Sequence, residues 1–300
     1  MPRNRLPQRV DIFEVGPRDG LQNEPAFIAT AHKVRFTDLL TEAGCRRIEV
    51  TAFVHPTWVP QMADAAEVLA SIARRPGVLY NALVPNLRGL DRAVEAGLGA
   101  VVTIMSASES HNRKNINMSV AESLEAIRRI NAGAAASGIK ARSYIATAYG
   151  CPIEGPVPPE RVADIASALE GFGSYEISLG DTTGMASPVS AYEVGALVKR
   201  RLTKASLAAH FHQAGGIEFA NVLASMEAGI DVVDSAAGGL GGCPYAPGAT
   251  GNIATETLVA MLHRMGIETG IDEEKIQAAA AFARSLSALH RPGRPVEDVR

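Results

Sequence analysis

His210 and His212 lie two positions apart at the end of a short apolar run, residues 207–209. In a β-strand, residues i and i+2 point to the same face, so both imidazole rings can reach one point in space. Two histidines held in this way can bind a metal ion, although an isolated His-x-His pair is more often a packing or solvent-contact feature. The pair therefore indicates a cation site only if further ligands lie nearby.

A glycine-rich loop follows the next apolar run, residues 230–233, and carries a cysteine and an asparagine. Its paired glycines, within residues 238–242, allow the backbone to approach a ligand closely. Most buried cysteines behave as small hydrophobic residues. Cys243 follows a glycine and precedes a proline, so we expect it to reach a site instead of packing in a core. The loop ends at Asn252, just before a stretch with the pattern of a helix.

Arg18 and Asp19 follow the first apolar run in the sequence Gly-Pro-Arg-Asp-Gly. Arg18 offers a fixed cation for a developing oxyanion, and a salt bridge at the rim of the fold is the alternative. An aspartate, two histidines and an asparagine amide oxygen would suit Mg²⁺ or Mn²⁺ in octahedral geometry, with positions left for substrate oxygens. A ligand set without thiolates argues against structural zinc, and zinc in an open site remains the alternative.

The composition excludes several classes of protein. Hydrophobic residues make up 47% and charged residues 20%, which is ordinary for a globular protein with a substantial core. A net charge of −3 gives no reason to expect nucleic acid or an anionic membrane as a partner. The three cysteines are far apart, which fits a reducing compartment better than a disulfide framework. No signal peptide and no apolar run near the roughly 18 residues of a membrane span are found, so we expect a cytoplasmic protein.

Short apolar runs alternate with longer amphipathic stretches almost to the end of the chain. The stretches repeat apolar residues at three and four positions, and several end in glycine, as helices do. Eight such pairs predict an α/β fold, a (β/α)8 TIM barrel, formed as one domain by about residues 10–265, with an extra C-terminal helix and tail over 270–300. A doubly wound open sheet is the alternative, but no Gly-x-Gly-x-x-Gly follows the first strand. The expected strands cover residues 10–15, 47–50, 79–84, 100–105, 141–146, 175–179, 207–212 and 231–234.

In a TIM barrel the active site lies at the C-terminal ends of the strands. Nearly every uncommon polar residue of the sequence falls at such an end. The groups are Arg18 and Asp19 after the first strand, Glu49 on the second, residues 106–117 after the fourth, residues 149–151 after the fifth, Asp181 just after the sixth, the two histidines on the seventh and Cys243 after the eighth. This clustering is the strongest argument from the residues themselves that the protein is an enzyme.

Six segments resemble the 3-hydroxy-3-methylglutaryl-CoA lyase family, which belongs to the metal-dependent barrel lyases and synthases. They are EVGPRDGLQNE at 14–24, IEVTAFVHPTWVPQMAD at 48–64, KNIN at 114–117, GCP at 150–152, YEISLGDTTG at 175–184 and GLGGCPYAPGATGNIATE at 239–256. The resemblance spans about residues 10–270. The GLGGCPYA loop is specific to the lyase branch, because the related isopropylmalate and homocitrate synthases lack it.

The resemblance implies a role for each matching position. The cation would be bound by Asp19, His210, His212 and Asn252. Arg18 would stabilise the enolate of the departing acetyl-CoA, and Cys243 would act in acid/base proton transfer. Glu49 and Asp181 would support proton movement or hold the site. Gln22 would lie near the substrate, and Asn23, Lys114 and residues 106–117 are candidate contacts to CoA.

The implied reaction is retro-Claisen cleavage of 3-hydroxy-3-methylglutaryl-CoA, or a related 3-hydroxyacyl-CoA, to acetyl-CoA and acetoacetate or another keto acid. The implied cofactor is Mg²⁺ or Mn²⁺, with Zn²⁺ as the alternative, and CoA is part of the substrate. A homodimer or higher homo-oligomer is expected by analogy with other barrels of this type.

The sequence also departs from the family pattern. After the two histidines the family usually has Asp-Thr, whereas this chain has Gln213 and Ala214, so we expect a carboxylate beside the metal ligands to be missing. Pro25 stands for the usual lysine, Ala52 for a serine, and His55 for a small residue. Changes around the polar end of the acyl group could indicate a different acyl-CoA.

Three other functions remain open. An aldolase that cleaves a hydroxy-oxo acid without CoA, or a Claisen synthase, would use the same fold, but the Cys243 loop disfavours both. A catalytically impaired barrel that serves as a binding subunit would explain Gln213 and Ala214. Such a barrel would have little reason to keep the complete set of metal ligands, Arg18 and Cys243.

Overall fold

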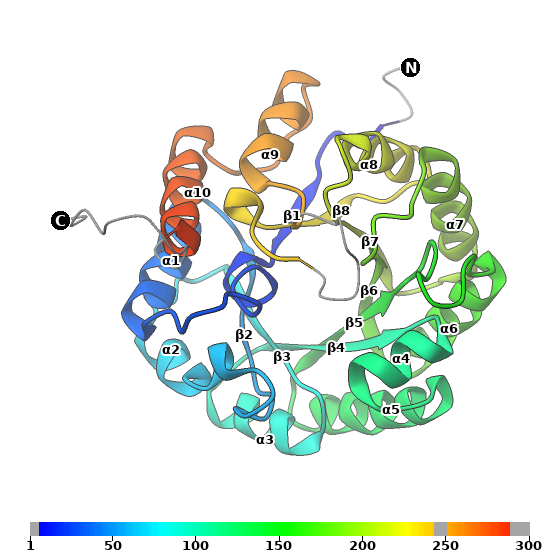
Figure 1. Cartoon of the computed structure of the whole chain (residues 1–300), viewed down its shortest axis with the longest axis horizontal. Helices are drawn as coiled ribbons and strands as arrows, with labels where there is room; N and C mark the ends of the chain where they lie inside the picture. Colours follow the sequence, from blue (N-terminus) through cyan, green and yellow to red (C-terminus); the bar gives the residue numbers. More distant parts are fainter. Residues whose placement is uncertain (1–5, 243–250, 289–300) are drawn as a thin grey trace.

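The computed structural model describes residues 6–242 and 251–288, and the strands in these ranges form one closed parallel barrel (Figure 1). Neighbouring strands follow the chain order, and β1 pairs with β8 to close the barrel, with Asp11 opposite Val232. The predicted fold is confirmed. The doubly wound alternative is wrong, because an open sheet would leave two unpaired edge strands. The strands are β1 (Asp11–Glu14), β2 (Arg47–Ala52), β3 (Leu79–Leu83), β4 (Ala100–Ser106), β5 (Lys140–Ala146), β6 (Ser174–Asp181), β7 (Ser206–Phe211) and β8 (Val232–Ser235).

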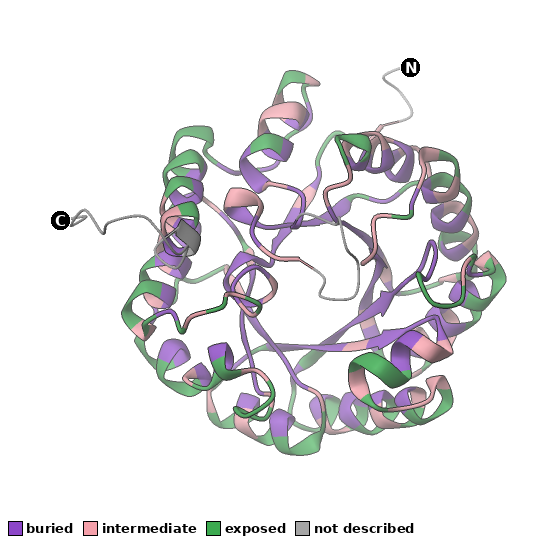
Figure 2. Cartoon of the chain, viewed as in Figure 1, coloured by how far each residue is buried: buried purple, intermediate pink, exposed green. Residues whose placement is uncertain are grey.

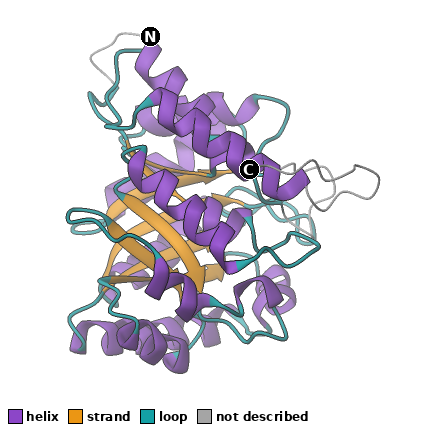
Figure 3. Ribbon diagram, turned by 90° about the vertical axis from the view of Figure 1, so that its left-hand side faces the viewer, coloured by secondary structure: helices purple, strands orange, loops and turns teal. Residues whose placement is uncertain are grey.

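Helices surround the barrel, which is seen end-on in Figure 1 and from the side in Figure 3. The predicted C-terminal helix is α10, which packs beside α1. None of the described helices is both long enough and apolar enough to cross a membrane. The helices are α1 (Thr30–Glu42), α2 (Ala65–Ser71), α3 (Leu87–Glu95), α4 (Glu109–Ile116), α5 (Val120–Ala136), α6 (Pro159–Gly171), α7 (Pro188–Arg201), α8 (Ile217–Glu227), α9 (Thr255–Arg264) and α10 (Glu273–Ala288).

Side-chain hydrogen bonds hold two of the segments between strands. The segment after β4, residues 106–117, contains helix α4, and the side chain of Ser108 caps this helix by accepting a hydrogen bond from the backbone N–H of His111 at 3.1 Å. Helix α2 ends at Ser71. Arg74 lies beyond its end and donates hydrogen bonds to the carbonyl oxygens of Leu69 at 3.0 Å and Ala96 at 2.8 Å, so it ties the ends of α2 and α3 together.

The core has two layers, and the inner one is partly charged. Buried side chains line the strands and the inward faces of the helices (Figure 2). The larger apolar layer lies between strands and helices, and a smaller cluster that includes Phe13 and Tyr144 fills the inside of the barrel. Arg142, Glu176 and Asp234 are buried beside this inner cluster. Their carboxylates and guanidinium pair with one another, as charged groups must when they are removed from water.

Glu14 joins three segments at the C-terminal mouth of the barrel. Its Oε1 accepts hydrogen bonds from the backbone N–H groups of Gly16 at 2.8 Å and Ala237 at 3.0 Å, and its Oε2 accepts one from Thr255 Oγ1 at 2.6 Å. Burial raises the pKa of Glu14 to about 7 even though these hydrogen bonds lower it. The carboxyl group fixes the turn after β1 relative to the start of α9, which brings together segments far apart in the sequence.

Candidate active site

Asp19, His210 and His212 form a cluster at the C-terminal mouth of the barrel, and their ligand atoms lie within 4.8 Å of one another. Asp19 belongs to the turn Gly16–Gly20 after β1, His210 to β7, and His212 follows β7 directly. The centroids of the two imidazole rings are 5.1 Å apart, and both rings lie on the same face of the strand, as the two-residue spacing predicts. Phe211, between them, points to the outer core and stacks on Tyr149 at 5.5 Å.

Asn252 completes the cluster because the backbone pairs its segment with the end of β7. It bridges to His212 in the backbone ladder, and the N–H of the following Ile253 donates to the carbonyl oxygen of Phe211 at 3.2 Å. The side-chain Nδ2 of Asn252 donates to Asp19 Oδ2 at 2.8 Å and to the carbonyl oxygen of Leu240 at 3.0 Å. Both amide hydrogens are therefore used, and Oδ1 is left to bind something else.

The donor set fits a hard divalent cation. Asn252 Oδ1 and His212 Nδ1 are buried and have no hydrogen-bond partner among the described residues, whereas buried polar atoms are nearly always paired. Burial raises the pKa of Asp19, but Arg18 and the two histidines lower it to about 2. Burial and the neighbouring His210 lower the pKa of His212 to about 4. Near neutral pH the cluster thus holds an ionised carboxylate and a neutral imidazole, the states that metal binding requires.

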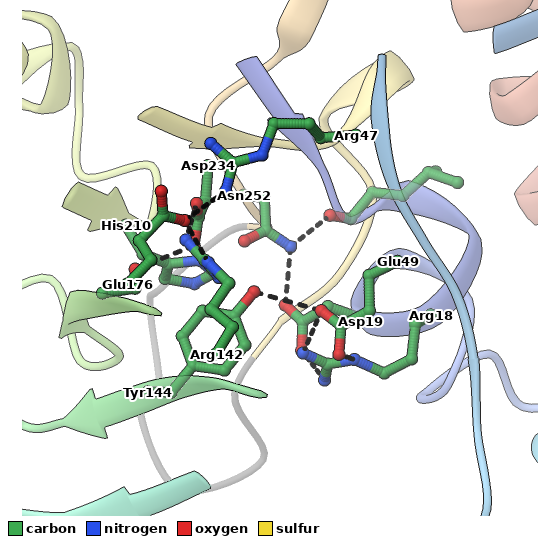
Figure 4. A network of polar contacts seen from close by, with 12 residues as sticks. Arg18, Asp19, Arg47, Glu49, Arg142, Tyr144, Glu176, His210, Asp234 and Asn252 are labelled. Carbon is green, nitrogen blue, oxygen red and sulfur yellow. Dashed lines mark hydrogen bonds and ion pairs between the residues drawn. The ribbon is translucent and has the colours of Figure 1, made fainter. Parts of the chain in front are cut away.

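Arg18 is fixed beside the cluster by Glu49 on β2. Its Nε and Nη2 donate to the two carboxylate oxygens of Glu49 at 2.9 and 3.0 Å, and its Nη1 donates to Asp19 Oδ1 at 2.7 Å (Figure 4). Tyr144 on β5 donates its hydroxyl to Glu49 Oε2 at 3.0 Å. Burial alone would lower the pKa of Arg18, but the two carboxylates raise it above its usual range. The guanidinium is therefore a charged group with one orientation.

A cavity of about 440 Å³ opens over these groups. Its polar side is formed by the cluster and Arg18 together with Gln22, which is expected near the substrate, and Asn23, a candidate contact to CoA. Asn23 Nδ2 donates to the carbonyl oxygen of Gly242 at 2.8 Å. The opposite side includes Trp58 and Ile104, which also line an adjoining, mostly apolar cavity of about 350 Å³.

Three predicted residues stand apart from this arrangement. Asp181 uses its Oδ1 to accept hydrogen bonds from the backbone N–H groups of Met185 at 2.9 Å and Ala186 at 3.1 Å, so it holds the turn after β6. Burial raises its pKa to about 6. Lys114 is exposed on α4, while the next residue, Asn115, lines the cavity. Cys243 lies outside the described residues.

The residues that replace the family's Asp-Thr pair have their own contacts. Gln213 Nε2 donates to the backbone carbonyl oxygen of Asn252 at 2.8 Å, so the glutamine holds a segment that carries a metal-ligand candidate. The backbone N–H of Ala214 donates to Glu218 Oε2 at 3.0 Å. Position 213 carries no carboxylate, as expected, but a different carboxylate lies beside His210. Asp234 Oδ2 is 3.4 Å from His210 Nδ1, and it comes from the neighbouring strand β8.

Sequence reasoning missed the side chains inside the barrel. Arg142 and Tyr144 lie two positions apart on β5, and both point inward, Tyr144 to Glu49 and Arg142 to Asp234. A signal for them exists, because polar residues at alternate positions of an apolar strand share a face. His111 on α4 is another cavity residue that was not singled out, and its Nδ1 lies 3.0 Å from Ser106 Oγ.

Comparisons with known proteins agree with this geometry. A family model described as HMGL-like matches residues 9–283. Hydroxymethylglutaryl-CoA lyase of Bacillus subtilis is 46% identical over 291 residues, 97% of each chain. The crystal structure of hydroxymethylglutaryl-CoA lyase from Pseudomonas aeruginosa is 43% identical, with a TM-score of 0.91 over 96% of this chain and 95% of that one. An HMG-CoA lyase from Acinetobacter baumannii, in complex with coenzyme A and 3-methylmalate, is 37% identical, with a TM-score of 0.88 over 94% of this chain and 92% of that one.

Proposed function

Because this chain belongs to the HMGL-like family, we propose that it is a carbon–carbon lyase that cleaves 3-hydroxy-3-methylglutaryl-CoA to acetyl-CoA and acetoacetate. The main observation behind the proposal is that three candidate metal ligands, Asp19, His210 and His212, line the same cavity as Arg18. Arg18 is buried there and held in one orientation by Glu49. Relatives named for this activity match nearly the whole chain.

The reaction moves one proton and breaks one bond. The 3-hydroxyl group loses its proton, the oxygen forms the ketone of acetoacetate, and the bond between carbons 2 and 3 breaks. Its electron pair stays on carbon 2 of the acetyl-CoA fragment as an enolate, which is then protonated. A divalent cation held by Asp19, His210, His212 and Asn252 would lower the pKa of the hydroxyl group. Mg²⁺ or Mn²⁺ fits this oxygen and nitrogen donor set better than Zn²⁺.

Arg18 supplies the positive charge that the enolate oxygen needs. Its guanidinium is held by both oxygens of Glu49, so its orientation is set before the substrate arrives. A donor that is fixed in advance stabilises a developing oxyanion without the cost of reorganising solvent. The remaining cavity wall, with Gln22 and Asn23, would contact the acyl-CoA.

The proton-transfer group is proposed to be Cys243, on the strength of the resemblance. The preceding residue, Gly242, lines the cavity, and its carbonyl oxygen accepts the hydrogen bond from Asn23. Glu49 and Asp181 are proposed to act through position, since each is occupied by hydrogen bonds to the groups described above.

Several finer assignments complete the proposal. CoA is bound in the Acinetobacter baumannii relative, and here Asn23 and Lys114 are the candidate contacts. A cytoplasmic location and a homodimer or higher homo-oligomer are proposed as well, and light scattering on the purified protein tests the latter.

The test is release of acetyl-CoA from a panel of 3-hydroxyacyl-CoAs in the presence of Mg²⁺ or Mn²⁺. We expect acetoacetate from 3-hydroxy-3-methylglutaryl-CoA, and a matched Asp19→Asn variant, which keeps the size of the side chain but not its charge, should be nearly inactive. Cleavage of a hydroxy-oxo acid without CoA would favour the aldolase. A protein that binds no metal and cleaves none of the substrates would favour the binding subunit. Either result would overturn the proposal.

A further inference from the structure

Asp234 is buried in the barrel and lies next to His210 (Figure 4). It stands opposite His210 in the pairing of β7 with β8, and its Oδ2 is 3.4 Å from His210 Nδ1, within ion-pair range. That nitrogen is buried and forms no hydrogen bond to any described residue, so Asp234 is the carboxylate placed to accept its proton. Ser178 on β6 donates its hydroxyl to the same Oδ2 at 2.9 Å. Arg142 on β5 donates from Nη2 to Oδ1 at 2.6 Å. Four neighbouring strands therefore meet at one carboxylate.

We infer that Asp234 is a positioning residue that fixes the ring orientation and the tautomer of His210. The inference rests on the proposed function, because it concerns how His210 is prepared to bind the cation. A carboxylate beside Nδ1 keeps the proton on that nitrogen and leaves Nε2 with the lone pair that a metal ligand needs. The ring of His210 also packs edge-on against Tyr144, with the ring centroids 5.8 Å apart, and this contact further limits its rotation.

Arg142 gives the carboxylate its orientation as well as its counter-charge. The guanidinium lies between the rings of Phe13 and Tyr144, at 3.9 and 4.7 Å from their centroids, so it has little freedom to move. Its Nε is held by Glu176 Oε1 at 2.6 Å. Because Arg142 is hydrogen-bonded to Oδ1 of Asp234, it is Oδ2 that faces His210.

This arrangement makes a sharp prediction for Asp234→Asn. Arg142 can pair only with the oxygen of the new amide, so the NH₂ group would face His210 Nδ1. That nitrogen would then have to accept, and the proton would move to Nε2, the nitrogen needed for the cation. The variant should bind Mn²⁺ about 10–100-fold more weakly, as expected when a carboxylate behind a metal-bound histidine is lost.

A merely structural role for Asp234 predicts something else. The carboxylate would then serve only to neutralise Arg142, and removing both charges together would restore normal metal binding. The double variant Asp234→Leu with Arg142→Met removes both and leaves Glu176 paired with Arg47 at 2.5 Å. Exchanging a buried ion pair for apolar residues of similar size is often tolerated, so this variant is expected to fold.

The experiment measures Mn²⁺ binding by calorimetry in the wild-type protein, Asp234→Asn, the double variant and Ser178→Ala. Ser178→Ala is the matched control, because it removes a hydrogen bond to the same carboxylate without touching the oxygen's contact with His210. We expect weaker binding in the first two variants and a change of less than about threefold in the control. Wild-type affinity in the folded double variant, or equal weakening in Ser178→Ala, would overturn the inference.

A second readout reports the tautomer directly. In spectra of the Mg²⁺ form labelled with ¹⁵N-histidine, the His210 signals, identified by their loss in His210→Gln, should show the proton on Nδ1 in the wild type and not in Asp234→Asn. An unchanged tautomer would overturn the inference. If the wild-type protein itself binds neither Mn²⁺ nor Mg²⁺, the proposed function fails, and that result is distinct from failure of the role of Asp234.

Discussion

Replacing Glu49 with glutamine should slow cleavage by about 10²-fold while the metal stays bound. Glu49 receives two hydrogen bonds from Arg18, at 2.9 and 3.0 Å, and both partners are buried. A glutamine keeps the shape but presents an NH₂ group to one of the guanidinium nitrogens, so one bond is lost and the other no longer joins two charges. A hydrogen bond to a charged group contributes about 1.5–3 kcal/mol. Arg18 would then turn toward Asp19, its remaining carboxylate.

If Arg18 loses its orientation, and with it about 3 kcal/mol of transition-state stabilisation, the rate falls by about 10²-fold, since each 1.36 kcal/mol is a factor of ten. The effect should appear in kcat, because Arg18 is needed most when charge develops on the thioester oxygen. The assay is steady-state acetyl-CoA release at saturating Mn²⁺, with the Mn²⁺ dissociation constant and urea unfolding measured on the same protein.

Tyr144→Phe is the matched control for Glu49→Gln. It removes the third hydrogen bond to Glu49, the one from the tyrosine hydroxyl at 3.0 Å, and leaves both bonds from Arg18 intact. We expect a fall in kcat of less than about tenfold. If folded Glu49→Gln retained kcat within a factor of about three of the wild type, the reasoning that Glu49 positions Arg18 would be refuted.

Four further changes test other parts of the site. Asp19→Ala should abolish Mn²⁺ binding in calorimetry and lower kcat by orders of magnitude, and tight binding in this variant would contradict the ligand assignment. Gln213→Asp should weaken Mn²⁺ binding by about 2–10-fold, because the shorter carboxylate cannot donate to the carbonyl oxygen of Asn252 as the amide does at 2.8 Å; equal or tighter binding would show that the glutamine is neutral. Cys243→Ser should depress turnover and leave the metal bound, so metal loss would argue against a role in proton transfer alone. Glu14→Gln should flatten the pH dependence of the free energy of unfolding. The pKa of Glu14 is raised from 4.5 to about 7, so its contribution to stability, about 3 kcal/mol, is complete below pH 4.5 and is lost as the pH rises to 7. Urea unfolding at pH 5 and pH 8 measures this, and a variant whose free energy of unfolding falls between the two pH values as much as that of the wild type would refute it.

The barrel and the metal cluster could be predicted because their signals are local. Alternating apolar runs define the strands, and the two-residue spacing of His210 and His212 places both rings on one face whatever the rest of the chain does. Asp19 joins them because the C-terminal ends of all parallel strands meet at one mouth of the barrel. An asparagine amide oxygen was already part of the expected donor set, and the family resemblance assigned Asn252 to it. Its segment is placed by backbone pairing with the end of β7, a contact that no spacing encodes.

The support for the cluster could not be predicted, because it depends on register between strands. Asp234 reaches His210 only since β8 pairs with β7 so that these two residues stand opposite each other, and a shift of one residue would turn the carboxylate out of the barrel. The loss of the family's aspartate at Gln213 therefore suggested a missing carboxylate, when one is present on another strand. The partner of Gln213 is likewise a backbone carbonyl, and sequence patterns carry no information about which carbonyl a side chain will meet.

The charged interior of the barrel makes sense only in combination with the site above it. Arg142, Glu176 and Asp234 are all buried, and replacing such a group by well-packed apolar residues is often neutral or stabilising. An apolar filling would leave His210 Nδ1 without a polar neighbour and its ring free to adopt either tautomer. Strand β5 carries both Arg142, which binds Asp234 beside His210, and Tyr144, which donates to Glu49 beside Arg18. It therefore supports both of these groups through their carboxylate partners. Such interior charges lower the stability that the barrel could reach, and in return they orient His210 and Arg18, the two groups that we propose for cation binding and for enolate stabilisation.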